Sequence, residues 1–359
     1  PRRLKSRVHL PPWFSNLLPE GVLRDFLALR ARVSPEREFF LLEQLGADLP
    51  GAVEVRSVGP PSVADELDLA LPATVDPGEP LKFSLAGLQL KFSAVADADR
   101  WRLPARGMGG RWLLKLPDSR HDHVPRNEFA TMSWAQTLGI DVPRVRLVEL
   151  ESVDGLPPEV RLTESKAVAV ERFDRLPDSR ERIHIEDFLQ VLNRYPWSRE
   201  KYRAANLETL ANIILAVAGV EDLHEFIRRT IFNLIIGNGD AHLKNWSLIY
   251  RDQRTARLSP AYDLVSTVQY MFDDGMALNL ANNKAWSLVT LDHFARLQTK
   301  LRSDVEQMAP DVVVSWVREF AGQALELLPG LMQTVDSGFV ETLRLHWKRT
   351  PLLGELGFR

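Results

Sequence analysis

Hydrophobic residues recur at helical spacing in two short stretches near the start of the chain. The first stretch covers residues 22–29. The second opens with Ser34-Pro35-Glu36, a sequence typical of an N-cap followed by a first-turn proline and acid, and it should end near Gly46. The pattern therefore predicts two short helices at the start of the chain.

The pattern changes in the next part of the chain. Residues 57–82 hold five prolines among acids and small residues, which is typical of a linker or a long loop. A helical pattern covers 127–138 and ends at Gly139. Around it lie short apolar runs with strand character, at 83–95 with a break at Ala86-Gly87, at 111–116, at 145–150 and at 167–170. These runs predict an α+β region built on a small sheet.

Beyond Glu171 the hydrophobic spacing is helical. Apolar residues lie three to four positions apart over 186–192, 207–218 and 223–236, and again from Thr290 to the end of the chain. One interruption, at 246–250 and 256–258, alternates in the way expected of two strands joined by a tight turn. A mainly helical region with one hairpin is predicted here.

Composition narrows the class of protein. The chain has 359 residues, of which 45% are hydrophobic and 26% charged, as in soluble globular proteins of two domains or lobes. The formal net charge of −3 provides no global basic field for holding nucleic acid directly. The sequence has no cysteine, which excludes disulfides, thiolate metal sites and cysteine nucleophiles. No apolar run has the length of a membrane span and no signal peptide is recognisable, so a cytoplasmic protein is expected.

Polar residues crowd the loop that joins the helix ending at Ile236 to the strand beginning at Trp246. Phosphoryl transfer needs an acid that orients or deprotonates the attacking hydroxyl, together with oxygen ligands for Mg²⁺. Asp240 supplies such an acid, and Asn245 and Asp263 supply the ligands. The alternative is that Asp240 caps a turn and Asp263 caps a helix. The ordered set of Asp, Asn, hairpin and Asp favours the functional interpretation.

His242 and Lys244 lie on the same loop. His242 has no second histidine nearby, which argues against a zinc hydrolase. The histidine either forms hydrogen bonds within the loop or near the phosphates, or is simply a solvated or packed side chain.

Lys115 lies on an apolar strand between Leu114 and Leu116. Burial of its ammonium group is costly unless the group meets an anion, and an α- or β-phosphate is such a partner. A lysine at a sheet edge that reaches water is the alternative. Glu128, on the following helix, is either an ion-pair partner of Lys115 or a plain surface acid.

Two stretches are candidates for contacts with a nucleotide. Small residues at Ser84, Ala86 and Gly87 allow backbone N–H groups to approach a phosphate, although the stretch matches no glycine-loop motif and a plain β-turn also explains it. Where the α+β region gives way to helices, the main chain near Glu171 and Phe173 is placed to bond the edge of a base. An ordinary strand end with exposed charges is the alternative there.

Several motifs occur in the order found in HipA-type serine/threonine kinases, and the resemblance covers nearly the whole chain. The motifs are Phe14–Gly21, Ser84–Lys91, Lys115-Leu116-Pro117, Glu171–Asp174, Asn238–Asn245 and Ala261–Asp263. HipA proteins are the toxins of bacterial HipBA toxin–antitoxin modules. The resemblance implies an α+β, bilobal protein-kinase-like fold, with a small antiparallel sheet in the N-terminal lobe and a mainly helical C-terminal lobe. It divides the chain into four parts: a partial helical N-terminal subdomain (1–56), a linker (57–82), a nucleotide-binding sheet (83–172) and a helical lobe with the catalytic loop (173–359).

The resemblance also implies a role for each candidate residue and the cofactors ATP and Mg²⁺. Asp240 is the catalytic base, Asn245 and Asp263 bind Mg²⁺, and Lys115 contacts the phosphates of ATP. His242 and Asp263 lie near the nucleotide.

The remaining implied roles concern the adenine hinge and regulation. Glu171 and Phe173 form the hinge to adenine, and Ala86 and Gly87 lie in the phosphate loop. Ser84 is the serine whose autophosphorylation expels this loop and inactivates the kinase.

Partners follow from the resemblance as well. Family targets are aminoacyl-tRNA synthetases, and the expected partner is a HipB-like helix-turn-helix antitoxin through which the complex reaches DNA. By this resemblance we expect the front of the N-terminal subdomain to be missing, either because a small protein such as HipS supplies it or because the chain is trimmed. Ala86 replaces the second serine of the HipT branch and Leu90 replaces an acid or proline, so Ser84 is expected to be the single regulatory serine. A catalytically silent co-repressor and a small-molecule phosphotransferase are the alternative functions.

Overall fold

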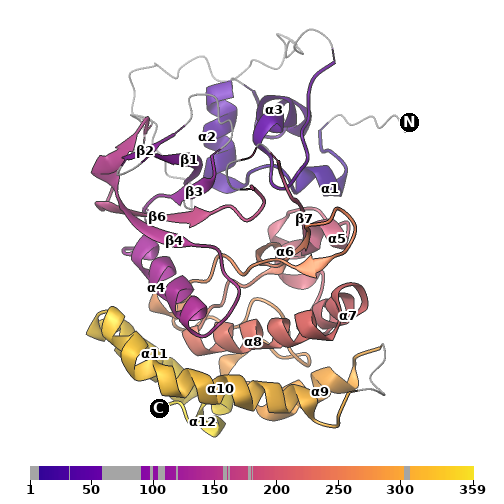
Figure 1. Cartoon of the computed structure of the whole chain (residues 1–359), viewed down its shortest axis with the longest axis vertical. Coiled ribbons are helices and arrows are strands. Elements are labelled where there is room, and N and C mark those ends of the chain that lie inside the picture. The colour runs from indigo at the N-terminus through magenta and orange to yellow at the C-terminus, as the bar shows by residue number, and fades with distance from the viewer. Residues whose placement is uncertain are drawn as a thin grey trace. The chain divides into compact units, whose positions relative to one another are not determined.

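The computed structural model describes residues 8–31, 33–58, 90–97, 100–103, 110–118, 120–156, 160, 162–176, 179, 181–302 and 308–359. The chain forms two compact units. The first comprises residues 1–126, 146–184 and 190–196, and the second comprises residues 127–145, 185–189 and 197–359. Each unit is therefore assembled from segments that lie far apart in the sequence, as the colours of Figure 1 show.

A six-stranded sheet of order β4-β6-β3-β1-β2-β5 forms the centre of the first unit (Figure 1). The pairings of β1 with β2, β1 with β3 and β3 with β6 are antiparallel, and β2 pairs with β5 in parallel. Alternate side chains such as Ala94, Leu114 and Ala169 are fully buried, which gives the sheet its hydrophobic face. The strands are β1 (Lys91–Asp97), β2 (Arg100–Arg102), β3 (Trp112–Lys115), β4 (Val145–Glu149), β5 (Val153–Asp154) and β6 (Lys166–Glu171).

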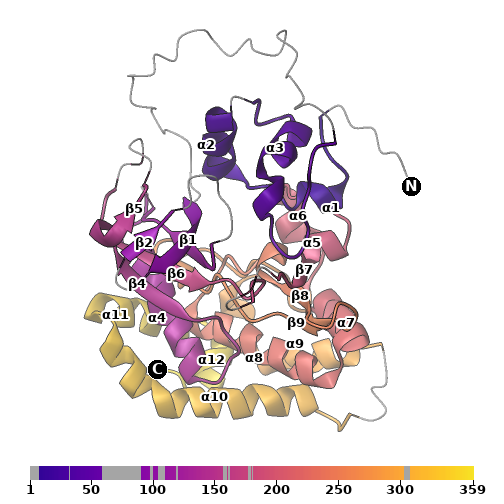
Figure 2. The same ribbon diagram turned by 45° about the horizontal axis from the view of Figure 1, so that its top comes forward.

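Three short helices, α1 (Pro12–Ser15), α2 (Gly21–Ala31) and α3 (Glu38–Leu45), complete the first unit (Figure 2). The predicted helix at 22–29 is confirmed by α2. The predicted N-cap at Ser34 is wrong, because α3 begins at Glu38. The Glu38 carboxylate is buried and accepts hydrogen bonds from Leu10 N at 2.7 Å and Ser15 Oγ at 2.8 Å. These long-range bonds fix the start of the helix.

Helices make up most of the second unit. Helix α8 (Val220–Ile236) buries Phe226, Ile231 and Phe232 completely, and α10 (Val312–Leu331) runs along it in Figure 1. Hydrophobic residues at helical spacing place these side chains on the inward faces. The other helices are α4 (Val124–Thr137), α5 (Phe188–Val191), α6 (Ser198–Arg203), α7 (Leu207–Ala218), α9 (Leu291–Thr299), α11 (Ser337–Arg349) and α12 (Pro351–Glu355).

A three-stranded sheet of order β7-β8-β9 accompanies these helices, with β7 (His184–Asp187), β8 (Ser247–Tyr250) and β9 (Arg257–Leu258). The predicted hairpin is confirmed, since Leu248 pairs with Leu258 in an antiparallel ladder. The helix predicted over 186–192 is wrong in its first half, where the chain forms β7. Pairing with β8 overrides the local helical spacing, and the main-chain N–H of Phe188 donates to Trp246 O at 3.1 Å.

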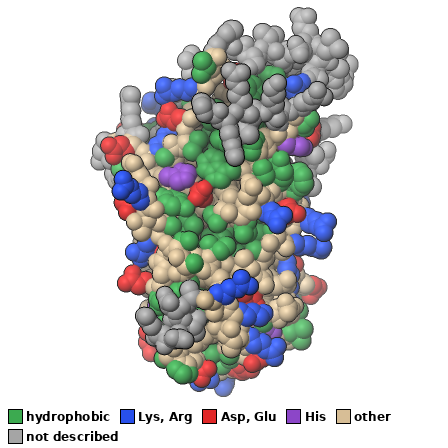
Figure 3. Space-filling view, turned by 90° about the vertical axis from the view of Figure 1, so that its right-hand side faces the viewer, with side chains coloured by type: hydrophobic (Ala, Val, Ile, Leu, Met, Phe, Trp, Pro, Cys, Tyr) green, Lys and Arg blue, Asp and Glu red, His purple; other side chains and the backbone are tan. Residues whose placement is uncertain are grey.

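The surface agrees with the small net charge. Figure 3 shows one face, on which acidic and basic side chains are interspersed among exposed hydrophobic ones. Within the residues described above, no helix combines the length and the hydrophobicity needed to span a membrane.

Candidate active site

Helix α8 leads directly into the polar loop, and Gly237 ends the helix. Gly237 has a left-handed backbone with φ of 63° and caps the last turn. A Cβ atom here would lie 2.6 Å from Cγ2 of Val268, so both the backbone angle and the available space require glycine. The sharp turn at Gly237 places the following residues in the loop rather than in another helical turn.

Side-chain hydrogen bonds hold the loop in one shape. The main-chain N–H of Asp240 donates to Asn238 Oδ1 at 3.0 Å, and Asn238 Nδ2 donates to Asn233 Oδ1 of α8 at 2.8 Å. The N–H of Gly239 donates to Thr267 Oγ1 at 2.7 Å. Bonds from two separate segments therefore fix the backbone that carries Asp240, as a preorganised site requires.

The far end of the loop folds back onto Asp240. Asn245 lies in a short 3₁₀ turn (Leu243–Asn245) and donates from Nδ2 to the main-chain oxygen of Asp240 at 2.8 Å. The N–H of His242 donates to the same oxygen at 2.7 Å. These bonds hold Asp240 and Asn245 together, as the sequence predicted for two residues of one site.

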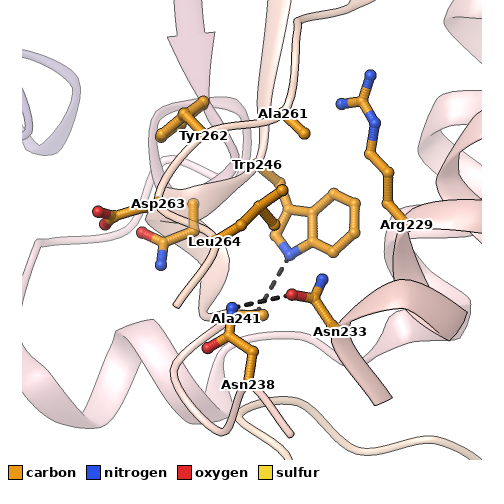
Figure 4. Close-up of a pocket in the computed structure, with 10 residues that line it drawn as sticks. Arg229, Asn233, Asn238, Ala241, Trp246, Ala261, Tyr262, Asp263 and Leu264 are labelled. Carbon is orange, nitrogen blue, oxygen red and sulfur yellow. Dashed lines mark hydrogen bonds between the residues drawn. The ribbon is translucent and has the colours of Figure 1, made fainter. Parts of the chain in front are cut away.

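Asn245 and Asp263 both line a pocket beside the loop. Figure 4 shows this pocket. In this view, the carboxylate of Asp263 and the guanidinium of Arg229 lie on opposite sides of the Trp246 indole. Arg229 donates to Ser259 O at 2.6 Å and pairs with a glutamate of its own helix. The residues lining the pocket are Arg229, Asn233, Asn238, Ala241, Asn245, Trp246, Ala261, Tyr262, Asp263 and Leu264.

The backbone at Asp263 is unusual and firmly held. Its φ of 60° lies in the left-handed region that residues other than glycine rarely adopt. Helix α4 fixes the segment that follows, because Asn127 Nδ2 donates to Ser266 O at 3.0 Å and Asn127 Oδ1 accepts from Ser266 N at 2.9 Å. Thr131 of the same helix donates to Leu264 O. Strain maintained by surrounding contacts is a common property of functional sites.

The donor set in this pocket suits Mg²⁺. The Nδ2 of Asn245 is bonded to the loop backbone, so the amide oxygen is the atom that can ligate a cation. Asp263 adds a carboxylate on the same pocket. Mg²⁺ binds oxygen, needs only one or two carboxylates and retains phosphate oxygens and water. The described part of the chain holds no cluster of three His, Cys, Asp or Glu side chains suited to a metal ion, so a Mg²⁺ here would use those outside ligands.

The half-buried carboxylate of Asp240 lies in surroundings that oppose its charge. Burial raises the pKa of Asp240 above its ordinary value, and the negative charge of Asp263 raises this pKa further. His242, a hydrogen bond from the hydroxyl of Tyr202 and the charge of Lys201 act in the opposite direction without outweighing burial. A carboxyl group with a raised pKa is a better proton acceptor near neutral pH than an ordinary aspartate.

The two other polar residues of the loop have structural contacts. Lys244 Nζ forms an ion pair with Asp187 Oδ2 of β7 at 3.0 Å, which ties the loop to the small sheet. The His242 ring packs edge-on against the Tyr202 ring, with centroids 5.2 Å apart. This contact agrees with the interpretation of His242 as a packed side chain, and a role near the phosphates stays a prediction.

The predicted nucleotide contacts Lys115, Glu171 and Phe173 belong to the first unit. Lys115 ends β3, where the ladder pairs it with Lys91 and Val168, and its side chain is only 6% exposed. This burial disfavours the alternative of a lysine that reaches water. Glu171 ends β6 and its carboxylate accepts from Arg111 Nε at 2.6 Å, while Phe173 is half-buried. Their contacts with a nucleotide stay predictions.

Comparison with known proteins identifies the family. Residues 2–56 match the HipA N-terminal domain and residues 83–325 match the HipA-like C-terminal domain. The chain belongs to the HipA family. Residues 57–82 lie between the two matches.

Named members of the HipA family include kinases. Y4dM of Sinorhizobium fredii, which is designated a kinase, is 45% identical over 315 residues that cover 86% of this chain and 74% of Y4dM. The serine/threonine-protein kinase toxin HipA of Shewanella oneidensis is 27% identical over 289 residues, which cover 71% of this chain and 62% of the toxin.

A solved structure shows that this HipA-family chain has the expected fold. HipA of Shewanella oneidensis MR-1, solved with HipB and operator DNA, superposes with a TM-score of 0.71 at 22% sequence identity. The superposition covers 96% of this chain and 86% of that protein. The predicted α+β, kinase-like fold is thereby confirmed.

The structure does not describe three of the predicted site residues, and it shows contacts that the sequence pattern did not indicate. Ser84, Ala86 and Gly87 fall outside the described residues. Sequence reasoning missed Tyr202, whose hydroxyl donates to Asp240 Oδ1 from 38 positions away. It also gave no role to Asn238, although that residue was visible within the HipA motif. A long-range contact such as the one from Tyr202 leaves no local pattern by which it could be found.

Proposed function

We propose that this HipA-family chain is an ATP- and Mg²⁺-dependent serine/threonine protein kinase that acts as a toxin. The observation that carries the proposal is the convergence of Asn245 and Asp263 on one pocket, beside a rigid loop that holds Asp240. An acid with a raised pKa next to two oxygen ligands is the set of groups that phosphoryl transfer requires.

In this mechanism Asp240 accepts the hydrogen bond and the proton of the attacking serine or threonine hydroxyl. The hydroxyl oxygen forms the new bond to the γ-phosphorus while the bond to the leaving oxygen of ADP breaks. Asn245 and Asp263 would hold Mg²⁺, and the bound ion would supply positive charge that neutralises the phosphate oxygens. The fixed loop backbone maintains Asp240 at the position where the hydroxyl must arrive.

The first unit contributes the nucleotide contacts in this proposal. Lys115, whose side chain is buried at the end of β3, binds the phosphates of ATP in this proposal. The main chain at Glu171 and Phe173 bonds adenine. The loop with Ser84, Ala86 and Gly87 covers the phosphates, and autophosphorylation of Ser84 switches the kinase off.

The proposal extends to substrate and partner. The protein substrate is an aminoacyl-tRNA synthetase, whose phosphorylation inhibits translation in the cytoplasm. The Shewanella HipA was solved together with HipB and operator DNA, and we extend that assembly to this chain. A HipB-like helix-turn-helix antitoxin neutralises the kinase and carries it to DNA, and a HipS-like small protein is a second candidate partner.

Incubation of the full chain with γ-labelled ATP, Mg²⁺ and a panel of aminoacyl-tRNA synthetases, with and without tRNA, tests the proposal. We expect label on one synthetase and on the kinase itself, with the kinase label lost in Ser84→Ala. Mg²⁺-dependent ATP binding without label on any protein would instead support the silent co-repressor. Label on a small molecule alone would support the small-molecule phosphotransferase.

A further inference from the structure

The hydroxyl of Tyr202 donates a hydrogen bond to Oδ1 of Asp240. Tyr202 lies near the end of α6, a helix that packs against the 3₁₀ turn Leu243–Asn245 of the loop. Its ring also contacts the His242 ring edge-on at 5.2 Å. Tyr202 is therefore in contact with the acid and with the next polar residue of the loop.

Lys284 holds Tyr202 in this place. Lys284 Nζ donates to the main-chain oxygen of Tyr202 at 2.9 Å and to that of Ala277 at 2.6 Å, and it lies 6.0 Å from the centre of the Tyr202 ring. The main-chain oxygen of Lys284 accepts from Met276 N at 2.8 Å. The segment 276–284, which follows Asp263 in the sequence, is thus fastened to α6 through one lysine.

We infer that Tyr202 is a positioning residue that fixes the carboxylate of Asp240 for catalysis, and that Lys284 supports it. The inference deepens the proposed function and rests on Asp240 being the base. A carboxylate on a single χ1–χ2 pair has several rotamers, and a hydrogen bond to one oxygen selects one of them. The structure offers a donor from a different helix for this purpose.

The hydrogen bond also distinguishes positioning from packing. Phenylalanine fills nearly the same space as tyrosine but lacks the hydroxyl, so Tyr202→Phe removes the bond to Asp240 Oδ1 and leaves the ring contact with His242. A tyrosine that only filled space would therefore lose little when it is replaced by phenylalanine.

Tyr202→Phe in the full chain, assayed by Mg²⁺-dependent phosphotransfer over a series of ATP concentrations, tests the inference. We expect kcat to fall by about 10- to 100-fold, the scale of a misplaced catalytic group, with KM for ATP unchanged. Tyr250→Phe is the matched control, because Tyr250 likewise donates to a carboxylate, Glu186 Oε2 at 2.7 Å, at the C-terminal end of β8. The control should retain the wild-type kcat and KM.

Two further variants keep the test decisive. 3-Fluorotyrosine at position 202 retains a hydroxyl that can donate to Asp240, so its kcat should stay close to the wild-type value. Lys284→Met should change kcat in the same direction as Tyr202→Phe but by less, since the hydroxyl itself remains.

Several outcomes would overturn the inference. A kcat that stays at the wild-type value in Tyr202→Phe would show a merely structural tyrosine. A faster Tyr202→Phe enzyme would show that the hydroxyl blocks the substrate's position instead of orienting the base. Full activity of Asp240→Asn would instead refute the proposed function itself, so the two failures are distinguishable.

Discussion

Asp48 in the first unit and Asp240 in the second are both half-buried, yet their surroundings differ in charge. Asp48 accepts hydrogen bonds from Arg172 and Arg175, each at 2.9 Å, and from Ser93 Oγ at 2.6 Å. Burial raises the pKa of Asp48, but these partners together outweigh burial and lower the pKa below its ordinary value. At Asp240 the balance is reversed, and burial dominates.

We take this difference to separate a structural carboxylate, Asp48, from the proposed catalytic one, Asp240. Two arginines neutralise Asp48, and they also bond the neighbouring Asp174, so the cluster joins the turn at 46–51 to the end of β6. Asp240 has instead the hydroxyl of Tyr202 and the charge of Asp263 near it. A poorly neutralised acid is unfavourable for folding and is found where chemistry requires a proton acceptor.

The largest expected effect on stability comes from Asp48→Ala. The substitution removes one of the two carboxylates that Arg172 and Arg175 share, so one positive charge is left uncompensated. Breaking a buried pair in this way costs about 3–5 kcal/mol of unfolding free energy. Urea denaturation measures the loss. Asp292→Ala is the control, because its pair with Arg296 is exposed and should be worth less than about 1 kcal/mol. Equal losses in both variants would remove the distinction between the two kinds of carboxylate.

His346 offers a test of burial without a nearby carboxylate. Its ring is fully buried, its Nε2 donates to Leu234 O at 2.8 Å, and burial lowers its pKa from 6.5 to about 4. The folded pKa lies below the unfolded one, so stability is complete above pH 6.5 and is lost as the pH falls toward 4. The difference between the folded and unfolded pKa values corresponds to a loss of about 3 kcal/mol of unfolding free energy.

Urea denaturation over this pH range, for wild type and His346→Gln, measures the effect. The variant keeps a donor for the Leu234 oxygen and cannot become charged, so its stability should fall less in acid. Parallel curves for the two proteins would show that His346 is not held neutral by burial.

A smaller effect is expected from Asp240→Asn. The raised pKa means that ionised Asp240 costs stability at neutral pH, and this cost disappears as the pH falls through the folded pKa. Removing the charge should therefore stabilise the protein near pH 7 by on the order of 1 kcal/mol, and not in acid. Thermal melting of Asp240→Asn should be compared with that of Asp222→Asn. The Asp222 carboxylate accepts from Leu258 N at 2.9 Å and pairs with Arg257. Asp222→Asn should destabilise, and the same sign in both variants would contradict the account.

The sequence predicted what local patterns determine. Helix α7 has the predicted bounds of 207–218, and the hairpin of β8 and β9 forms where alternation appeared, because hydrophobic spacing alone specifies these elements. The 184–187 strand and the start of α3 were misjudged, because pairing with β8 and the bonds of Glu38 are long-range. The order of motifs along the chain pointed to Asp240, Asn245 and Asp263 as candidate site residues, and Asn245 and Asp263 line one pocket. No local pattern indicated Tyr202.

The central claim is that Asp240 is the base of an ATP-dependent phosphotransfer. The rate of label transfer from γ-labelled ATP to protein, measured for wild type and Asp240→Asn at equal folded concentration, tests it most directly. We predict that the rate falls by at least ~10²-fold, the usual contribution of a positioned acid or base, while ATP binding persists. An unchanged rate in Asp240→Asn would contradict the claim.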